Sequence, residues 1–341
     1  MSFVKKCIVW DLDNTVWNGI CLEGRVAVRP EIRKVIAALD QRGILHAIAS
    51  RNEKEAAWQV LCEQDLAHYF VAPQINWLPK STNILTISDQ LNISLDAIAF
   101  VDDEPFEREQ VAFMLPDVLT IDAEQAQHLT RLPAFSPGYT TRESKSRRDF
   151  YQADEKRKAA EQQFSSREAF LIACRMKLTV RPMQKTDINR VSELMSRTHQ
   201  LNTTGLILEK EKLHRMLSNP QSDQMIMVAE LEDKYGRNGI IGTALIQRDP
   251  HCYRIRFFAL SCRILGRGIE RAFLADLMQK AAADGLKQTE AMYKNTGRNS
   301  MMRAFYQMCG FKHKDDLADQ TMMFSLSNSH IPGVPKWVEV L

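Results

Sequence analysis

The sequence predicts an α/β protein of two consecutive domains, an open parallel sheet followed by a mixed α+β domain. Residues 1–130 alternate short apolar runs with helical patterns, which is typical of parallel strands joined by crossover helices. Residues 176–341 contain several alternating or apolar runs in succession and then a glycine turn that opens a helix. A length of 341 residues gives each domain enough chain for its own core.

Composition and charge exclude several other classes of protein. Hydrophobic residues make up 45% and charged residues 26% of the chain, as in an ordinary globular protein. The formal net charge of +3 is small for this length, so we expect neither nucleic acid nor a membrane surface as partner. We find no membrane-spanning apolar run and no signal peptide pattern. The seven cysteines form no C-x-x-C pair, which predicts reduced thiols in a cytoplasmic protein.

The first predicted strand ends in two carboxylates. Residues 8–10 are apolar, and Asp11 and Asp13 follow them in a D-x-D-x-T pattern. Open α/β sheets bind their ligands at the carboxyl ends of strands. Paired carboxylates at such an end can hold Mg²⁺ and leave one oxygen free to attack a phosphoryl group. Because the pattern alone is common, the other strand ends must supply the rest of a phosphoryl site.

A small β-flap is predicted over residues 16–28, beside Asp11. An Asn-Gly pair at 18–19 is a strong hairpin turn signal. Cys21 lies on this flap. Pro30 then begins a helix, because a missing N–H costs nothing in the first helical turn.

Further buried strands end in polar groups as well. Strands are predicted at 44–49, 69–71 and 97–101, with helices at 53–64 and 82–91 between them. The polar residues at these strand ends and at the start of the second helix are Ser50, Asp102, Asp103 and Lys80. Each of them also has an ordinary structural explanation: Ser50 and Asp103 could cap helices, and Lys80 could be a surface lysine.

These parts resemble the haloacid dehalogenase (HAD) superfamily, whose motifs run DxDxT, Ser/Thr, Lys and an acidic pair. The resemblance implies that Asp11 is nucleophile and Mg²⁺ ligand. It also implies that Asp13 is a general acid/base whose backbone carbonyl binds the metal. The remaining implied members are the phosphate-binding residues Ser50 and Lys80 and the metal-binding residues Asp102 and Asp103.

Residues 131–175 are predicted to form a linker and a connecting helix. Pro133, Pro137 and Gly138 interrupt the alternating pattern. A charged helix is predicted at 149–170, and its basic residues indicate a solvated face.

The second domain has a glycine turn after its last long strand. Strands are predicted at 176–182, 224–230, 240–247 and 253–260. The turn is Arg263-x-x-Gly266-x-Gly268, and backbone N–H groups of such a turn can approach a pyrophosphate. It resembles the acyl-CoA-binding turn of GNAT-type acyltransferases, and Asn299 and Tyr306 lie in stretches that resemble that fold's second conserved segment.

The GNAT-like resemblance implies a phosphopantetheine site. Its implied residues are Arg263, Gly266, Gly268, Asn299 and Tyr306. A purely structural explanation also stands, in which the two glycines permit close packing and Tyr306 belongs to the core. We identify no acidic general base on a middle strand, so acetyl transfer itself is not predicted.

The two halves together resemble the FkbH-like family. The segments that carry this resemblance are 11–17, 49–52, 79–81, 100–107, 199–205 and 260–270. It implies an enzyme that loads a glyceryl unit from D-1,3-bisphosphoglycerate onto an acyl carrier protein, in polyketide assembly. A thiol would displace phosphate at C1, and the C3 phosphate would be hydrolysed with Mg²⁺.

Several alternatives stay open at this point. Cys21 is either the carrier of a glyceryl thioester or an apolar flap residue, and Cys262 is a weaker candidate. His199 and Asn202 could contact a carrier arm, but a polar loop held by its own hydrogen bonds is favoured. The chain could instead be a plain Mg²⁺-dependent phosphatase with the GNAT-like half as lid or dock. A non-catalytic carrier-binding scaffold is disfavoured, because Asp11 and Asp13 are both intact.

Overall fold

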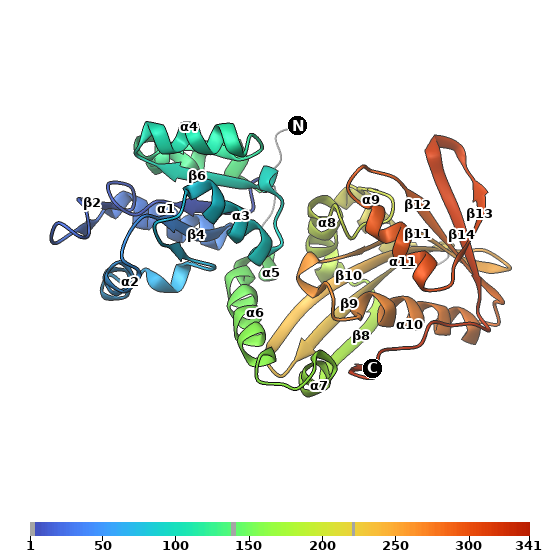
Figure 1. The fold of residues 1–341 in the computed structure, drawn as a ribbon. Helices are drawn as coiled ribbons and strands as arrows, with labels where there is room; N and C mark the ends of the chain where they lie inside the picture. Colours follow the sequence, from blue (N-terminus) through green and yellow to red (C-terminus); the bar gives the residue numbers. More distant parts are fainter. Residues whose placement is uncertain (1–3, 138–140, 220–221) are drawn as a thin grey trace. The chain divides into compact units, whose positions relative to one another are not determined.

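The computed structural model describes residues 4–137, 141–219 and 222–341. The chain forms two compact units, Met1–Glu155 and Lys156–Leu341 (Figure 1). The predicted linker is therefore divided between the units. Gly138, which was expected to interrupt it, lies outside the described residues.

The first unit contains a five-stranded parallel sheet of order β5-β4-β1-β6-β7. Its strands are β1 (Cys7–Trp10), β4 (Leu45–Ser50), β5 (Gln74–Ile75), β6 (Ile98–Asp102) and β7 (Leu119–Asp122). The three central strands, β1, β4 and β6, are buried at every residue, as expected of parallel strands covered on both faces.

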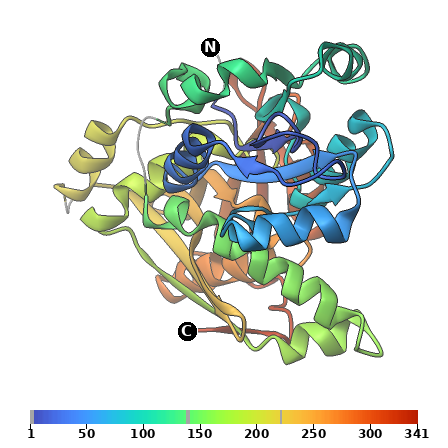
Figure 2. The same ribbon diagram turned by 90° about the vertical axis from the view of Figure 1, so that its left-hand side faces the viewer.

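Helices cover both faces of this sheet (Figure 1 and Figure 2). α1 (Pro30–Gln41) and α2 (Lys54–Glu63) share one apolar cluster with Ile8 and Trp10 of β1. α3 (Lys80–Leu91) and α4 (Pro105–Met114) share another with Val9 of the same strand. Successive strand residues point to opposite faces, so β1 contributes to both clusters.

The predicted flap is confirmed as an antiparallel pair, β2 (Trp17–Asn18) and β3 (Ala27–Val28). The predicted strand at 69–71 is wrong. The 3₁₀ helix η1 (Ala67–Tyr69) is followed there by a single bridge between Phe70 and His46. Phe70 is buried with only this one bridge. The edge strand next to β4 is β5, which lies after the predicted segment in the sequence.

The segment after the gap belongs to the first unit through a close backbone approach. α5 (Arg142–Lys145) and the first part of α6 (Arg147–Glu161) follow it. Gly43 has a φ of +71°, and a Cβ there would lie 2.4 Å from the carbonyl oxygen of Ser144. The side chain of Arg147 donates to the carbonyl of Gly43 at 2.7 Å. Glycine is therefore required at this contact.

The predicted helix at 149–170 is two helices, α6 and α7 (Arg167–Ala173). Ser166 has an extended backbone, and its hydroxyl accepts a hydrogen bond from the N–H of Ala169 at 3.1 Å. This is an N-cap, so a new helix begins here rather than continuing α6.

The second unit contains an eight-stranded mixed sheet of order β13-β14-β12-β11-β10-β9-β8-β15. Its strands are β8 (Met176–Pro182), β9 (Gln224–Asp233), β10 (Gly236–Arg248), β11 (Cys252–Leu260), β12 (Gln288–Lys294), β13 (Lys312–Asp316), β14 (Thr321–Ser327) and β15 (Val338–Val340). α8 (Ile188–Arg197) and α9 (Lys210–Leu217) pack in one apolar cluster. α7, α10 (Ile269–Ala283) and α11 (Ser300–Met308) pack in another.

These topologies confirm the predicted fold class. The first unit is an open parallel sheet covered by helices, and the second is a mixed α+β domain. No helix within the described ranges has both the length and the apolar character needed to cross a bilayer.

Candidate active site

The site lies at the carboxyl edge of the parallel sheet and begins with Asp11. This residue follows β1 directly, its backbone N–H donates to the carbonyl of Val101 at 2.9 Å, and its side chain is buried. The apolar strand thus fixes the carboxylate at a sheet position where a neighbouring strand also ends.

Lys80 links two carboxylates from different strands. Its ammonium Nζ lies 2.9 Å from Oδ1 of Asp11 and 2.5 Å from Oδ2 of Asp102. Lys80 is the first residue of α3 and is only 4% exposed, so the surface-lysine explanation is wrong. A buried ammonium between two buried carboxylates is a charge arrangement that a protein tolerates only when the partners pair closely.

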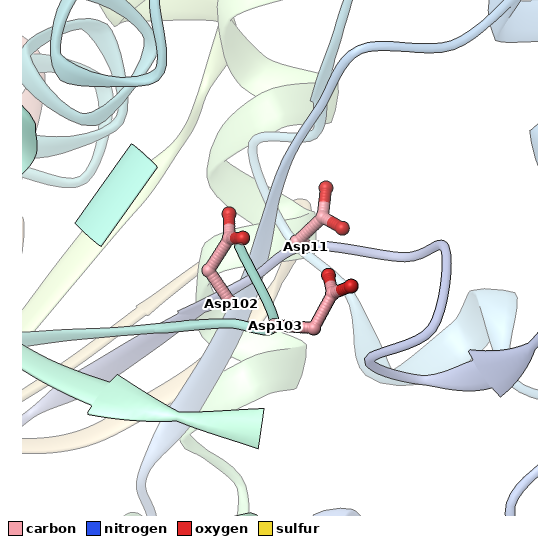
Figure 3. A group of neighbouring side chains, drawn as sticks. All are labelled: Asp11, Asp102 and Asp103. Carbon is pink, nitrogen blue, oxygen red and sulfur yellow. The ribbon is translucent and has the colours of Figure 1, made fainter. Parts of the chain in front are cut away.

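Three carboxylates gather at this point. Oxygen atoms of Asp11, Asp102 and Asp103 all lie within 4.8 Å of one another (Figure 3). When all three carboxylates are ionised, the single ammonium of Lys80 leaves an excess of two negative charges. An all-oxygen donor set with this charge fits a hard divalent cation such as Mg²⁺.

Burial and neighbouring charges perturb the ionisation of this group. Burial is the main reason why the pKa of Asp11 rises to about 7; Lys80 opposes the shift and Asp102 adds to it. Burial also raises the pKa of Asp102. Burial alone would lower the pKa of Lys80, but the two carboxylates raise it above its usual value, so the ammonium stays charged.

Asp13 is held by three donors and does not join the carboxylate cluster. Its Oδ1 accepts from Trp17 Nε1 at 2.7 Å and from the backbone N–H of Cys21 at 3.0 Å. Its Oδ2 accepts from Asn52 Nδ2 at 2.9 Å. The flap and the loop after β4 together therefore fix the orientation of this carboxylate.

Cys21 lies at the flap beside Asp13, with its thiol partly buried. Burial, and secondarily the charge of Asp13, raise the pKa of the Cys21 thiol above its usual value. The thiol is therefore protonated near neutral pH and needs a base before it can attack. Cys262, the weaker candidate, lies in the second unit.

Ser50 and Thr15 hydrogen-bond to members of the cluster. Ser50 ends β4, is buried, and its hydroxyl hydrogen-bonds to Asp11, which stabilises the ionised carboxylate. The hydroxyl of Thr15 lies 3.2 Å from Oδ1 of Asp103 and accepts from the backbone N–H of Asp103 at 3.1 Å.

Two contributors were not predicted from the sequence. Asn52 is 1% exposed, and its Oδ1 has no partner among the described residues. Arg108 donates from one nitrogen to the carbonyls of Asp102 and Asp103, at 2.8 and 2.7 Å. An asparagine after a strand and an arginine in a helix carry no sequence signal of their own.

In the second unit, the residues that the resemblance implies for phosphopantetheine binding contact other residues of the chain. Gly266 and Gly268 both have φ of +75°, and Cβ atoms there would lie 2.7 Å from Arg167 Nη2 and 2.9 Å from Pro335 Cγ. Arg263 donates to the hydroxyl of Ser261 at 3.1 Å.

Asn299 and Tyr306 are both fully buried. The Asn299 amide nitrogen donates to backbone carbonyls of Asn202 and Lys294, at 2.8 and 2.9 Å. Tyr306 packs against Phe311 and other rings of the core, and burial raises the pKa of its hydroxyl above the usual range. The structure thus places neither side chain at the surface.

The loop that follows α8 is held by its own hydrogen bonds, as predicted. Asn202 donates to the carbonyl of Thr198 at 3.1 Å and accepts from the N–H of Gly205 at 2.8 Å. Asn202 is 2% exposed, so it is not available to a carrier arm on the surface.

Comparisons with known proteins give partial matches among solved structures. No family model and no curated protein matches the chain. Among solved structures, one is the N-terminal part of a Bacteroides fragilis protein, which contains a phosphatase domain complexed with Mg. It is 30% identical with a TM-score of 0.36, and the match covers 40% of this chain and 42% of that one. The chain thus spans less than half of that protein part.

Other matches are acetyltransferases. One is a putative GNAT-family acetyltransferase from Desulfovibrio desulfuricans, 18% identical with a TM-score of 0.36, covering 44% of this chain and 99% of that one. Another is spermidine N-acetyltransferase from Vibrio cholerae in complex with CoA and spermine. It is 12% identical with a TM-score of 0.36, covering 46% of this chain and 98% of that one.

Proposed function

We propose that the chain transfers a glyceryl unit from D-1,3-bisphosphoglycerate to the phosphopantetheine thiol of an acyl carrier protein and removes the C3 phosphate. In this proposal the product supplies polyketide biosynthesis. The observation that carries the phosphoryl part is the cluster of Asp11, Asp102 and Asp103 around the buried ammonium of Lys80.

Removal of the C3 phosphate would use the residues of this cluster. Asp11 would attack phosphorus, and Asp13 would give a proton to the leaving C3 oxygen and later take one from water. Lys80 and Ser50 would offset the charge of the phosphoryl oxygens. Asp11, Asp102 and Asp103, with the backbone carbonyl of Asp13, would hold Mg²⁺, which supplies charge stabilisation when bound.

The acyl transfer step would use the flap. The thiolate of Cys21 would attack the C1 carbonyl of the acyl phosphate, forming a thioester and releasing phosphate. The carrier thiol would then displace Cys21. The hydrogen bond from the Cys21 backbone to Asp13 supports this role, because it keeps the thiol near a carboxylate that can accept its proton.

A second candidate is a plain Mg²⁺-dependent phosphatase acting on another small phosphate ester. The raised pKa of Cys21 favours this candidate, because a protonated thiol is a poor nucleophile. Direct attack by the carrier thiol is a variant of the first candidate that also fits this observation.

One experiment separates these candidates. The protein is incubated with Mg²⁺, a phosphopantetheinylated acyl carrier protein and D-1,3-bisphosphoglycerate, and both proteins are weighed by mass spectrometry while phosphate is measured. A glyceryl mass shift on the carrier supports the transferase. Phosphate release without that shift supports the plain phosphatase, and the absence of both contradicts the transferase.

The role of Cys21 has a matched control in the same unit. Cys21→Ala should abolish a glycerylated form of the enzyme, whereas Cys62→Ala, at an exposed position on α2, should leave it unchanged. Transfer to the carrier at the wild-type rate in Cys21→Ala would show that the carrier thiol attacks directly.

A further inference from the structure

Two neighbouring parallel strands of the second unit separate partway along their length. Within the described chain, β11 and β12 pair only from Cys252↔Gln288 to Ile255↔Ala291. β11 continues to residue 260 and β12 to residue 294. We call residues 256–260 and 292–294 the splayed ends. The predicted pyrophosphate turn follows the splayed end of β11 directly.

A segment from elsewhere in the chain pairs with the splayed end of β11. This inserted segment, residues 201–204, forms an antiparallel bridge between Asn202 and Ala259. The N–H of Thr203 donates to the carbonyl of Phe258 at 3.0 Å, and the hydroxyl of Thr203 accepts from the N–H of Phe258 at 3.0 Å. The N–H of residue 260 donates to the carbonyl of residue 201 at 2.9 Å.

The inserted segment also reaches the splayed end of β12. The carbonyl of Thr203 accepts from the N–H of Lys294 at 2.9 Å. Asn299 then joins the two sides, because its amide nitrogen donates to the carbonyls of Asn202 and Lys294 at 2.8 and 2.9 Å. Asn202, Thr203 and Asn299 are at most 2% exposed, so these bonds are shielded from water.

Two carbonyls of the turn accept hydrogen bonds from other parts of the second unit. The carbonyl of Gly266 accepts from Arg167 at 3.0 Å, and the carbonyl of Arg267 accepts from Trp337 Nε1 at 2.8 Å. The left-handed backbone at Gly266 and Gly268 and the close approach of Pro335 already explain both glycines without a ligand.

We propose that the inserted segment is a permanent strand of this sheet and that it excludes acyl-CoA and pantetheine from the splayed ends. A pantetheine arm carries two amides on an extended chain, and it would bind here by pairing with unpartnered main-chain groups, as an added strand does. The main-chain groups of Phe258, residue 260 and Lys294 are already paired with the chain itself. A ligand would have to displace buried hydrogen bonds before making its own.

This inference goes beyond the proposed function and does not depend on it. The second unit acts without bound acyl-CoA, whatever reaction the carboxylate cluster performs. In the glyceryl transfer proposed above, the carrier's arm would have to be recognised without these positions.

Coenzyme A binding and amide hydrogen exchange test the proposal on the full chain. We expect no saturable binding of CoA or acetyl-CoA by calorimetry, and slow exchange of the amides of Thr203, residue 260 and Lys294 without ligand. Rapid exchange at these amides in the free protein would overturn the proposal. So would CoA binding that speeds exchange in the inserted segment, which would make the segment a displaceable gate.

A pair of threonine variants isolates the key contact. Thr203→Val removes the hydroxyl that accepts from Phe258, and we expect exchange of the Phe258 amide to rise roughly tenfold. Thr243→Val is the matched control, because Thr243 is equally buried in β10 and its hydroxyl has no partner among the described residues. Equal exchange of Phe258 in both variants would contradict the contact. Phosphate release should be unchanged in both, which keeps this test separate from that of the proposed function.

Discussion

Two pairs of parallel strands, β1 with β6 and β11 with β12, have polar groups at their carboxyl ends. The two pairs differ in how those polar groups are paired. At the ends of β1 and β6, three carboxylates lie within 4.8 Å of one another with one ammonium to offset them. At the splayed ends of β11 and β12, a segment of the chain itself takes up the main-chain donors and acceptors. The first pair of strands keeps buried charge, whereas at the second the inserted segment pairs with the main-chain groups of Phe258, residue 260 and Lys294.

This contrast shows how a functional site differs from motif residues whose polar groups are satisfied within the chain. Buried charge without full compensation is costly, so a fold retains it where chemistry requires it. Backbone groups that pair internally are stable without a ligand. Motif residues are therefore weak evidence of function until their hydrogen bonds are accounted for. The following variants test the contrast, beginning with the largest expected effect.

Removing the charge of Asp11 should abolish phosphate release at the carboxylate cluster. Asp11→Asn keeps the size of the side chain but loses the nucleophilic oxygen, so phosphate release should fall by about 10³-fold or more. Steady-state phosphate release with Mg²⁺ measures this. Asp89→Asn, at an exposed position on α3, is the control. A rate within tenfold of wild type would rule out Asp11 as nucleophile.

Removing the ammonium should destabilise the first unit. Lys80→Met leaves the buried carboxylates of Asp11 and Asp102 without their counter-ion, so the free energy of unfolding should fall by about 3 kcal/mol or more in the presence of EDTA. Urea unfolding measures it, with the exposed Lys54→Met as control. Mg²⁺ should restore part of the loss, because it replaces the missing positive charge. A loss equal to that of the control would contradict the charge arrangement.

Removing the Asn299 amide, which joins the inserted segment to β12, should lower stability without changing activity. Asn299→Leu cuts the bonds to the inserted segment and to β12, and we expect a loss of about 3 kcal/mol in unfolding free energy. Phosphate release per folded molecule should not change. Asn295→Ala, in the exposed turn nearby, serves as control. A fall in phosphate release per folded molecule would show that Asn299 takes part in chemistry.

Replacing Asn52 should have a smaller effect on catalysis. Its amide orients the carboxylate of Asp13, so Asn52→Leu should lower kcat by about tenfold to a hundredfold while KM stays nearly constant. Steady-state kinetics on a phosphate ester measures both, with Gln59→Ala on the exposed side of α2 as control. A rise in KM of about tenfold to a hundredfold with unchanged kcat would place Asn52 in substrate binding instead.

The smallest effect concerns pH and a buried histidine of β4. Burial lowers the pKa of His46 from 6.5 to about 3, and its Nδ1 accepts from Trp10 Nε1 at 3.0 Å. The unfolded chain binds a proton below pH 6.5 and the folded one does not, so stability falls as pH drops. We expect a loss of about 1 kcal/mol between about pH 6.5 and 5.5. Urea unfolding of wild type and His46→Gln should differ in this slope; parallel slopes would refute the assignment.

The sequence predicted the carboxylate site because the signal was local. Asp11, Ser50 and Asp102 directly follow apolar runs, and parallel strands bring their carboxyl ends to one edge. Asn52 escaped prediction because its importance depends on a carboxylate that lies 39 positions earlier in the chain. Nothing in its own neighbourhood distinguishes it from a loop residue.

The second unit shows where local signals mislead. The motif around Asn299 predicted the fold correctly, but its amide bonds to a segment 97 positions earlier, which no periodicity reveals. The strand predicted at 69–71 failed for a similar reason. Burial of Phe70 needs one bridge to His46, and apolar spacing cannot distinguish one bridge from a ladder.

The contact between Gly43 and Ser144 bears on how the molecule can be cut into pieces. The backbone of residue 144 lies where any side chain at position 43 would be, and Tyr151 of α6 completes an apolar cluster of the parallel sheet. A shortened chain ending near residue 130 would lose this covering and expose apolar surface to water. A stop after Glu155 retains it, so the minimal independently soluble fragment of the first half should extend into α6.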